Sequence, residues 1–315
     1  MKIISHELVS SLNISPSTCV NWVRESFASK SGAQLPPKIS LHPQSDDFFN
    51  TMPCLLPSPR NRFGVKVVSR IQGATPSLSS LFLLYDSTTG EALALMDADW
   101  ITTMRTGAVA AIAQQTLRRT GELVYAFIGL GNTARATLLC MLESEPDRHF
   151  TVRLLEHKGQ EASFIHRFES YGNVSVQCVD SARELIAGSD VIISCITKTE
   201  DLICPDDSAF REGCLVIPVH TRGFQNCDLF FDKVFGDDTG HIRNFRYFDR
   251  FKHFAELSEV LDGSVPGREK ASERILSYNI GLGLHDLVFA DKIYQLLVEA
   301  GTEINLEKPV EKFWI

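Results

Sequence analysis

The sequence predicts an α/β fold, in which a domain with a doubly wound parallel sheet is joined to a second α/β domain. Residues 124–128 are apolar and stop at a glycine turn before an amphipathic stretch, as expected for a strand, a turn and a helix. Apolar runs and helical patterns then alternate as far as Phe235, which favours a parallel sheet. Extended segments between residues 38 and 96, separated by Pro, Asn and Gly, favour a mostly antiparallel sheet.

The glycine turn predicts a Rossmann-like dinucleotide site. Gly129 permits a tight turn, Gly131 lets the backbone approach a pyrophosphate, and Ala134 lets the helix pack closely on the strand. The phosphates would lie at the positive end of the helix dipole, so Asn132 and Thr133 in this turn are predicted to bind the cofactor. A purely structural strand-to-helix turn is the alternative.

The second strand of this domain indicates which dinucleotide binds. Residues 150–155 are extended and end at Glu156, where an acidic side chain binds the two hydroxyls of an adenosine ribose. A carboxylate repels a 2′-phosphate, so the sequence predicts NAD(H) over NADP(H), although Lys158 leaves room for the phosphorylated cofactor. Ser194 and Thr197 follow a later buried strand and are predicted to line the adenine or ribose side.

The bulk composition narrows the classes of partner. With 315 residues, of which 44% are hydrophobic, the chain can form two domains. A net charge of −8 argues against a nucleic-acid partner. No apolar run reaches the roughly 18 residues of a membrane span, so we expect a cytoplasmic protein without a membrane partner. The eight cysteines show no metal-ligand spacing, and no metal site is expected.

Other segments give further expectations for secondary structure. Ser15 and Pro16 predict the start of a helix, as an N-cap followed by Pro in the first turn. Residues 229–235 predict a strand, and the charged and aromatic residues 241–260 predict a pair of surface helices. The stretch 283–300 has apolar residues at helical spacing and is predicted to pack against the N-terminal domain.

Two cations in the first third of the chain are candidates for binding a carboxylate. Lys66 lies between Val65 and Val67 on an apolar strand, which favours a functional cation over a lysine that reaches the surface along its alkyl stem. Arg105 begins a helix rich in small residues and can offer a planar two-pronged contact to a carboxylate. An interdomain salt bridge is the alternative for Arg105.

A third group of candidates follows the later strands. His220 ends an apolar strand, and we predict that it faces the substrate as an acid or base, with a structural histidine as the alternative. Arg222 could hold a second substrate carboxylate. Asp237 and Asp238 follow another strand, where turn formation is favoured over metal binding.

Taken together, these motifs resemble the ornithine cyclodeaminase and μ-crystallin family over almost the whole chain. The resemblance rests on Gly64-Val-Lys66, Met104-Arg-Thr-Gly-Ala108, Gly129-Leu-Gly-Asn-Thr-Ala134, Asp190-Val-Ile-Ile-Ser194, and Glu256, Gly263, Gly267-Arg268, Asn279-Ile-Gly281 and Asp286. It implies a substrate and dimerisation domain over residues 1–118, completed by the C-terminal helix 287–315, and an NAD-binding domain over residues 119–286. It also implies a homodimer.

The resemblance also assigns roles to individual residues. It implies that Lys66 and Arg105 hold the substrate carboxylate and that Arg105 and Thr106 lie near the cofactor phosphates. Asn279 and Gly281 match a segment that passes close to the nicotinamide. Asp286 matches an acidic position in the following helix. Two further residues complete the predicted substrate-binding set: Lys38, which stands where the family has an arginine, and Met52.

One departure from the family bears on the substrate. Cyclodeaminases carry an aspartate at the position that falls on His220, where it handles the side-chain amine of ornithine. An imidazole is a poor partner for an ammonium group, so the sequence argues against ornithine.

The function predicted is an NAD(H)-dependent oxidoreductase acting on a small α-amino acid or its imine. It includes amino-acid dehydrogenases, imine reductases and enzymes that oxidatively cleave an N-substituted amino acid. Lys66 and His220 are its predicted catalytic residues. The alternatives are an NAD-dependent deaminating cyclase of the ornithine cyclodeaminase type and a non-enzymatic cofactor-binding protein of the μ-crystallin type.

Overall fold

The structure, a computed structural model, describes residues 1–44, 46–197, 199–307 and 309–313 and divides into two compact units. Unit 1 comprises Met1–Ile14, Gly32–Thr102 and Asp286–Ile315, and unit 2 comprises Ser15–Ser31 and Thr103–His285. Two helices, α3 (Asp99–Leu117) and α10 (Gly283–Leu297), continue along the chain from one unit into the other. Unit 2 therefore includes the N-terminal segment Ser15–Ser31.

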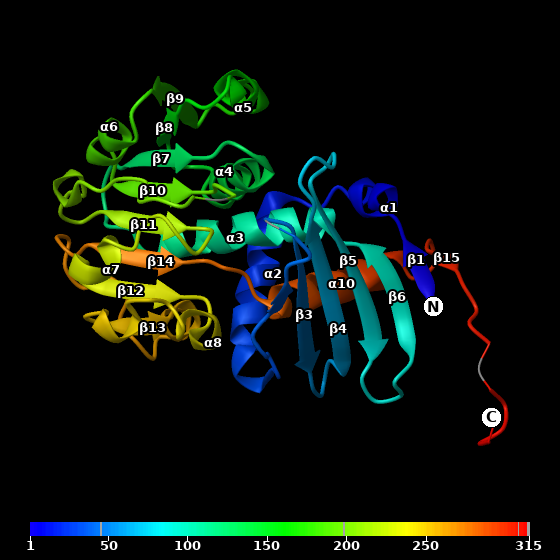
Figure 1. The fold of residues 1–315 in the computed structure, drawn as a ribbon. Coiled ribbons are helices and arrows are strands. Elements are labelled where there is room, and N and C mark those ends of the chain that lie inside the picture. The colour runs from blue at the N-terminus through cyan, green and yellow to red at the C-terminus, as the bar shows by residue number, and fades with distance from the viewer. Residues whose placement is uncertain (45, 198, 308, 314–315) are drawn as a thin grey trace. The chain divides into compact units, whose positions relative to one another are not determined.

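Unit 1 is built on a seven-stranded sheet with the strand order β15-β1-β6-β5-β4-β3-β2 (Figure 1). Its strands are β1 (Lys2–Ile4), β2 (Ile39–Leu41), β3 (Phe48–Leu56), β4 (Arg62–Arg70), β5 (Leu78–Asp86), β6 (Ala92–Asp97) and β15 (Thr302–Glu303). Strands β2 to β6 form an antiparallel meander, whereas β1 pairs with β6 in parallel. The antiparallel sheet predicted for this region is confirmed. The short helix α1 (His6–Ser11) follows β1.

Helix α10 packs within unit 1 from Asp286 onward, as predicted for the last long helix. Asp291 accepts a hydrogen bond of 2.8 Å from Nε of Arg62 on β4, and the ring of Phe289 lies 6.2 Å from that of Trp100. Leu287 lies against Gly64, where a Cβ atom would come within 3.0 Å of its side chain. The helix therefore covers the sheet with apolar contacts and holds it with an ion pair.

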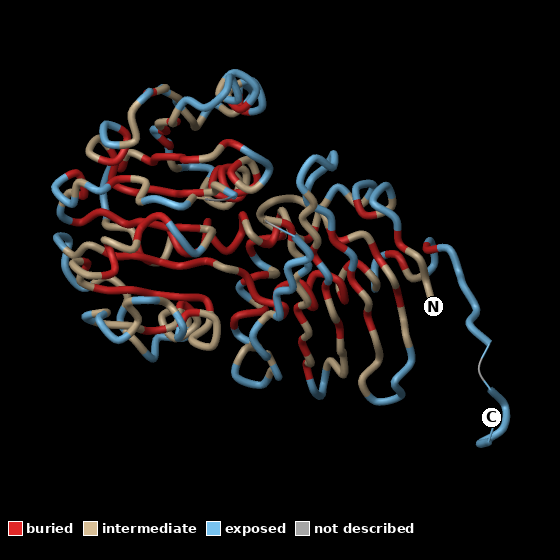
Figure 2. Tube along the Cα trace, viewed as in Figure 1, coloured by how far each residue is buried: buried red, intermediate tan, exposed pale blue. Residues whose placement is uncertain are grey.

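Unit 2 contains an eight-stranded parallel sheet with the order β13-β12-β14-β11-β10-β7-β8-β9 (Figure 1). The strands are β7 (Val124–Ile128), β8 (Phe150–Leu155), β9 (Val174–Val179), β10 (Val191–Ser194), β11 (Leu215–Pro218), β12 (Lys233–Gly236), β13 (Phe254–Glu256) and β14 (Ile275–Tyr278). Figure 2 shows that the central strands are buried, as expected where helices cover both faces of a parallel sheet.

Side chains of β7 alternate between two helical layers. Phe127 points to Phe164 of α5, with ring centroids 6.0 Å apart, whereas Ile128 joins an apolar cluster with Leu185 of α6. The doubly wound fold is therefore confirmed. The helices of this unit are α2 (Pro16–Ala28), α4 (Asn132–Ser144), α5 (Gln160–Phe168), α6 (Ala182–Ala187), α7 (Cys227–Phe230), α8 (Thr239–Ile242) and α9 (Leu257–Leu261). Short 3-10 turns are η1 (Lys30–Gly32), η2 (Asp207–Ala209) and η3 (Phe248–Arg250).

Local predictions hold for α2 and are wrong in two places. Ser15 caps α2 by accepting a hydrogen bond from the Thr18 backbone, and Pro16 is its first residue. In the segment 229–235, Leu229 and Phe230 end helix α7, and strand β12 begins only at Lys233. The predicted helix pair at 241–260 instead contains the edge strand β13, because Phe254 and Ala255 pair with β12.

The helices also bear on the expectation about membranes. Among the helices of the described residues, none combines the length and apolar character that a membrane-spanning segment requires.

Candidate active site

The turn after β7 has the geometry of a phosphate-binding loop. Gly129 has a φ of +81°, and a Cβ atom there would lie 2.9 Å from the carbonyl carbon of Cys195. Gly131 caps α4, and within the described residues no side chain caps this helix end or comes within 4 Å of a Cβ built on Gly131. The first backbone N–H groups of α4 are therefore open to an anion.

Helix α3 brings the predicted residues Arg105 and Thr106 close to α4. A Cβ atom on Gly107 would come within 2.5 Å of the carbonyl carbon of Ala136, so only glycine allows this approach of the two helices. Arg105 is 6% exposed and Thr106 is partly buried. The small residues of the motif thus place the guanidinium within the nucleotide-binding unit.

The acidic residue expected to contact the ribose has the predicted position. Glu156 directly follows β8 and is exposed, with its backbone N–H bound to the carbonyl of Val179. Lys158 and Gly159 follow with φ angles of +54° and +73°, so the chain turns sharply behind the carboxylate. Thr197 lies exposed after β10. The side chains of Glu156 and Thr197 are accessible to a ligand.

Ser194 and His220 contact each other at the ends of neighbouring strands. Oγ of Ser194 lies 2.6 Å from Nε2 of His220, and the ring is also hydrogen-bonded to the backbone of Arg222. Burial lowers the pKa of His220 to about 4, and the contact with Arg222 opposes this shift only in part. The imidazole is therefore neutral at neutral pH, and the role of His220 as an acid or base stays a prediction.

Asn279 presents a buried amide with an unfilled hydrogen-bonding position. Its backbone N–H donates to the carbonyl of Pro218 at 3.0 Å, and its Oδ1 accepts from Ser277. The residue is 2% exposed, yet Nδ2 has no hydrogen-bond partner among the described residues. A buried amide donor without a partner is costly, so this position fits a polar group of a bound ligand.

Gly281 connects Arg105 to a buried carboxylate. Its φ is +90°, and a Cβ atom would lie 2.1 Å from the Arg105 guanidinium, so the side chain of Arg105 rests directly on this glycine. The backbone N–H of Gly281 donates to Oδ2 of Asp237 at 2.6 Å. Asp237 is fully buried and joins the ends of β12 and β14, rather than forming the local turn that its sequence position suggested.

A second network holds the neighbouring acidic residues. Lys30 donates to the backbone carbonyl of Asp237 at 2.8 Å and forms ion pairs with Asp238 and Glu256. Burial raises the pKa of Asp238, but hydrogen bonds and the charges of His241 and Lys30 outweigh burial and hold the pKa at about 2. These acids therefore act together as a structural ion-pair network.

Unit 1 contributes a buried ion pair. Lys66 and Asp286 are both 0% exposed, and Nζ of Lys66 donates to Oδ1 of Asp286 at 2.7 Å. Lys66 stands in one cross-strand row with Met52, Phe82 and Met96, all of which are buried. A lysine that reaches solvent is thereby ruled out, because the ammonium group is desolvated and paired.

Two predicted substrate-binding residues lie at more accessible positions. Lys38 immediately precedes β2 in unit 1 and is partly buried. Arg222 is exposed on the loop after β11 and lines a pocket of about 980 Å³ in unit 2. The sequence reasoning missed Arg246 and Tyr247 in the same pocket, although the density of charge and aromatic rings at 241–260 was the available signal.

An open helix N-terminus after a glycine turn, an acid after the second strand and an unsatisfied amide define a Rossmann-type nucleotide-binding protein with an additional α/β unit. A family model described as the ornithine cyclodeaminase/mu-crystallin family matches residues 2–301. The chain belongs to this family, and the predicted resemblance is confirmed.

Two curated relatives illustrate the activities found among similar proteins. Alanine dehydrogenase of Archaeoglobus fulgidus is 36% identical over 327 aligned positions, which cover 93% of this chain and 94% of the relative. N-((2S)-2-amino-2-carboxyethyl)-L-glutamate dehydrogenase of Staphylococcus aureus is 28% identical over 245 aligned positions, which cover 72% of this chain and 71% of the relative. Such relatives are amino-acid dehydrogenases and imine reductases.

Two solved structures share the fold. Delta(1)-pyrroline-2-carboxylate reductase of Thermococcus litoralis, solved with NADH and L-proline, is 25% identical, with a TM-score of 0.83 and coverage of 96% of this chain and all of that chain. An archaeal alanine dehydrogenase dimer with bound NAD is 24% identical and has a TM-score of 0.80. The match covers 98% of this chain and 99% of that chain.

The Lys66–Asp286 pair gives a test of stability. Replacing Lys66 with Met leaves a buried carboxylate without its cation, so we expect the free energy of unfolding to fall by about 3–5 kcal/mol. In the double variant Lys66→Met, Asp286→Leu the buried charge is also removed, and most of the loss should be recovered. Urea denaturation measures both effects.

Lys2→Met is the matched control for this test, because Lys2 pairs with the exposed Glu303 at 3.6 Å in the same unit. It should cost less than about 1 kcal/mol. A loss for Lys66→Met no larger than that of Lys2→Met would contradict the buried pair.

Proposed function

We propose that the chain is an NAD(H)-dependent oxidoreductase acting on an α-amino acid or its imine. The observation that carries this proposal is the buried guanidinium of Arg105, which rests on Gly281 in the same unit as the glycine turn and the unsatisfied Asn279 amide. A desolvated guanidinium beside a nucleotide-binding edge suits a substrate carboxylate. The activities of the relatives give independent support.

The residues of unit 2 fit a nicotinamide dinucleotide. Gly129, Gly131, Asn132 and Thr133 would hold the pyrophosphate at the N-terminus of α4, and Glu156 would accept hydrogen bonds from the adenosine ribose. Asn279 would donate its free Nδ2–H to a polar group of the cofactor. We further propose that Arg105 and Thr106 lie near the phosphates and that Ser194, Thr197 and Gly281 complete the binding surface.

When bound, NAD⁺ accepts a hydride from the Cα atom of an amino acid. The chain's own residues must bind the carboxylate and orient Cα. Arg105 would contact the carboxylate through two N–H groups, and Lys66 would supply a second cation, with Lys38, Met52 and Arg222 completing the substrate contacts. Because Lys66 is held by Asp286, the pair can pass a proton between Nζ and the carboxylate without exposing an isolated charge.

In the proposed function, His220 acts as a hydrogen-bonding residue. At a pKa of about 4 the neutral imidazole is a weak base, so it suits hydrogen bonding to Ser194 better than proton removal at neutral pH. A neutral imidazole also gives no electrostatic stabilisation to a substrate side-chain ammonium group. This disfavours the ornithine cyclodeaminase reaction as the alternative function.

The proposal is tested by supplying NAD⁺ with a panel of amino acids and following NADH absorbance. We expect net NADH formation and a drop in kcat/KM of about 10-fold to 100-fold in Arg105→Ala, because a hydrogen bond to a charged group is lost. Arg24→Ala, at an exposed arginine on α2, is the control and should leave the rate unchanged.

The other outcomes separate the alternatives. Ammonia release without net NADH would support a cyclodeaminase. NADH binding without turnover of any amino acid would support a cofactor-binding protein of the μ-crystallin type.

The preference for NAD(H) has its own test. In Glu156→Ala the repulsion of a 2′-phosphate is removed, so the ratio of the Kd values for NADPH and NADH should fall by about tenfold or more. Binding is measured by the fluorescence of the reduced cofactor. Glu169→Ala, at another exposed acid of unit 2, should retain the ratio, whereas an unchanged ratio in Glu156→Ala would remove this residue from the ribose site.

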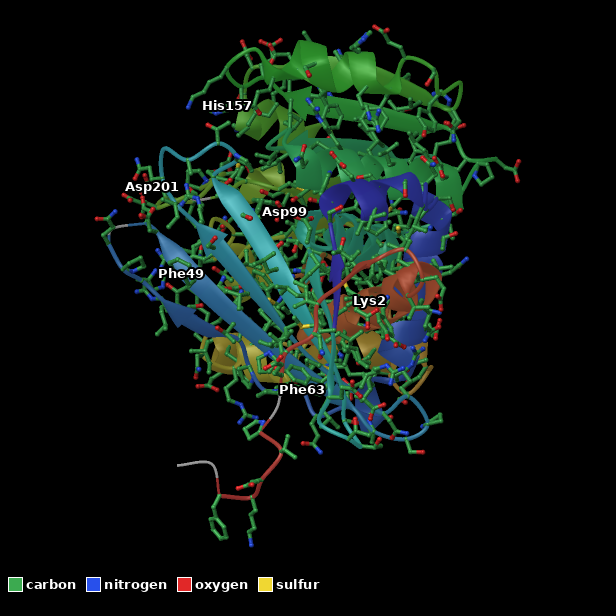
Figure 3. All side chains as sticks on the ribbon, turned by 90° about the vertical axis from the view of Figure 1, so that its right-hand side faces the viewer. Lys2, Phe49, Phe63, Asp99, His157 and Asp201 are labelled. Atoms are coloured by element: carbon green, nitrogen blue, oxygen red, sulfur yellow. The ribbon has the colours of Figure 1, made fainter. Side chains whose placement is uncertain are left out.

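We propose a homodimer formed through the open face of the unit 1 sheet. Phe49, labelled in Figure 3, and Leu41 pair across β3 and β2, while Val67 and Leu81 pair across β4 and β5. All four side chains are exposed on the face opposite Lys66. An apolar sheet face of this kind is typical of a protein interface, and a similar protein has been solved as a dimer.

A charge on this face tests the dimer. Leu81 is 52% exposed, and Leu81→Glu would place two charges in a two-fold interface, so the dimer Kd should rise by about 100-fold or more. Leu296→Glu on α10, where the leucine is 58% exposed, should have no effect. Sedimentation velocity measures both, and a Leu81→Glu protein that stays dimeric would disprove this interface.

A further inference from the structure

The pocket of about 980 Å³ in unit 2 lies outside the residues that fit the dinucleotide. It is formed by the segments that follow β10, β11 and β12, and its polar lining includes Asp201, Arg222, Asn244 and Arg246. Asp201 is labelled in Figure 3. These segments all leave the carboxyl ends of parallel strands, which is the edge where open α/β sheets bind their ligands.

The order of the strands sets the place of this pocket along the edge. Glu156 follows β8, Gly129 follows β7, Ser194 ends β10 and His220 follows β11, and these strands are consecutive neighbours in the sheet. Arg222 comes two residues after His220 and lines the pocket. The proposed cofactor contacts therefore run along the sheet edge from β8, where Glu156 would bind the adenosine ribose, to β11. The pocket lies at the β11 end of this row, away from Glu156.

The two arginines of the pocket are not paired with a carboxylate of the described residues. Among the described residues, neither Arg222 nor Arg246 forms an ion pair, whereas other cations of unit 2, such as Arg118 and Lys233, do. The guanidinium of Arg246 lies 5.1 Å from the centroid of the Tyr247 ring. Stacking on an aromatic ring orients the planar group and leaves its N–H donors available.

The acids of the pocket do not cancel this charge. Asp228 is 2% exposed and accepts a hydrogen bond of 2.8 Å from the Tyr278 hydroxyl, and burial raises its pKa to about 7. Part of the Asp228 population is thus uncharged at neutral pH. Glu200 and Asp201 also line the pocket, and both are exposed, so their carboxylates are solvated. The groups of the pocket that suit a carboxylate are therefore the guanidinium groups of Arg222 and Arg246.

We propose that this pocket binds a second carboxylate of the substrate, so that the substrate class is an amino acid with a carboxylate on its side chain or on a nitrogen substituent. The inference rests on the proposed oxidoreductase function. Arg222 and Arg246 bind the second carboxylate, and Asn244 supplies a neutral hydrogen-bond donor. A monocarboxylic amino acid leaves both arginines without a partner and gains nothing from the pocket.

Matched pairs of substrates test the inference with the intact protein and NAD⁺. The pairs are L-glutamate and L-glutamine, L-aspartate and L-asparagine, and N-(1-carboxyethyl)-L-alanine and N-ethyl-L-alanine. Each pair differs chiefly in the second carboxylate, so the ratio of kcat/KM for acid over neutral member isolates its recognition. We expect this ratio to be about tenfold or more in at least one pair, and to fall about tenfold in Arg222→Ala and in Arg246→Ala.

Two further variants sharpen the test. Arg243→Ala removes an exposed arginine from the same segment that does not line the pocket, and it should keep the ratio. Asp201→Asn removes the carboxylate that competes with the ligand, and it should raise the ratio. A ratio near one in every pair, or a ratio that Arg222→Ala and Arg246→Ala leave unchanged, overturns the inference while the oxidoreductase function stands.

Direct binding distinguishes this failure from failure of the function. If no amino acid yields NADH, the proposed function fails, and the pocket is then tested by calorimetric titration with glutarate in the presence of NADH. Glutarate binding that is lost in the double variant Arg222→Ala, Arg246→Ala supports a carboxylate site. Absence of glutarate binding to the wild-type protein overturns it.

Discussion

The parallel direction of the strands in unit 2 is the constraint on which the candidate site depends. Each strand ends at the same edge, so residues far apart in the sequence meet there. The backbone N–H of Val219 donates to Ser194, that of Asn279 to Pro218 and that of Asp237 to Tyr278. These contacts extend the hydrogen-bond ladder past the strand ends. The spacing of the candidate groups is consequently set by the sheet.

Buried polar groups give this edge its chemical character. The guanidinium of Arg105 is fixed by a glycine with a positive φ, and that glycine is held by a buried aspartate. In unit 1, Lys66 is likewise fixed by Asp286. Charges that are held in one orientation lose little entropy when they meet a ligand, and this is what the proposed carboxylate contacts of both cations require. Burying each charge costs desolvation free energy, and the packing of the surrounding fold must offset this cost.

Local sequence patterns were sufficient for the parts of the fold that depend on neighbours in the chain. The Gly129 turn, the cap of α2 at Ser15 and the acid at Glu156 are all encoded within a few residues, and the structure contains each of them. The roles predicted for Lys66 and Arg105 stay predictions.

The remaining features depend on strand order, which no local pattern specifies. Strand β14 lies between β11 and β12, and only this crossover brings Gly281 to Asp237. The contact of Ser194 with His220 likewise requires β10 and β11 to be neighbours. Strand β13 was missed because three residues are too few for a recognisable alternation.

The division of unit 1 into separate stretches of chain has a consequence for biosynthesis. Lys66 and its partner Asp286 are 220 positions apart, and all of Thr103–His285 is translated between them. During synthesis, the meander of β2 to β6 therefore remains uncovered until α10 has left the ribosome. Until then the ammonium group of Lys66 lacks Asp286 and lies on an apolar sheet face. Closure of unit 1 is accordingly a late event in synthesis, and the neighbouring unit has its full sequence available to fold first.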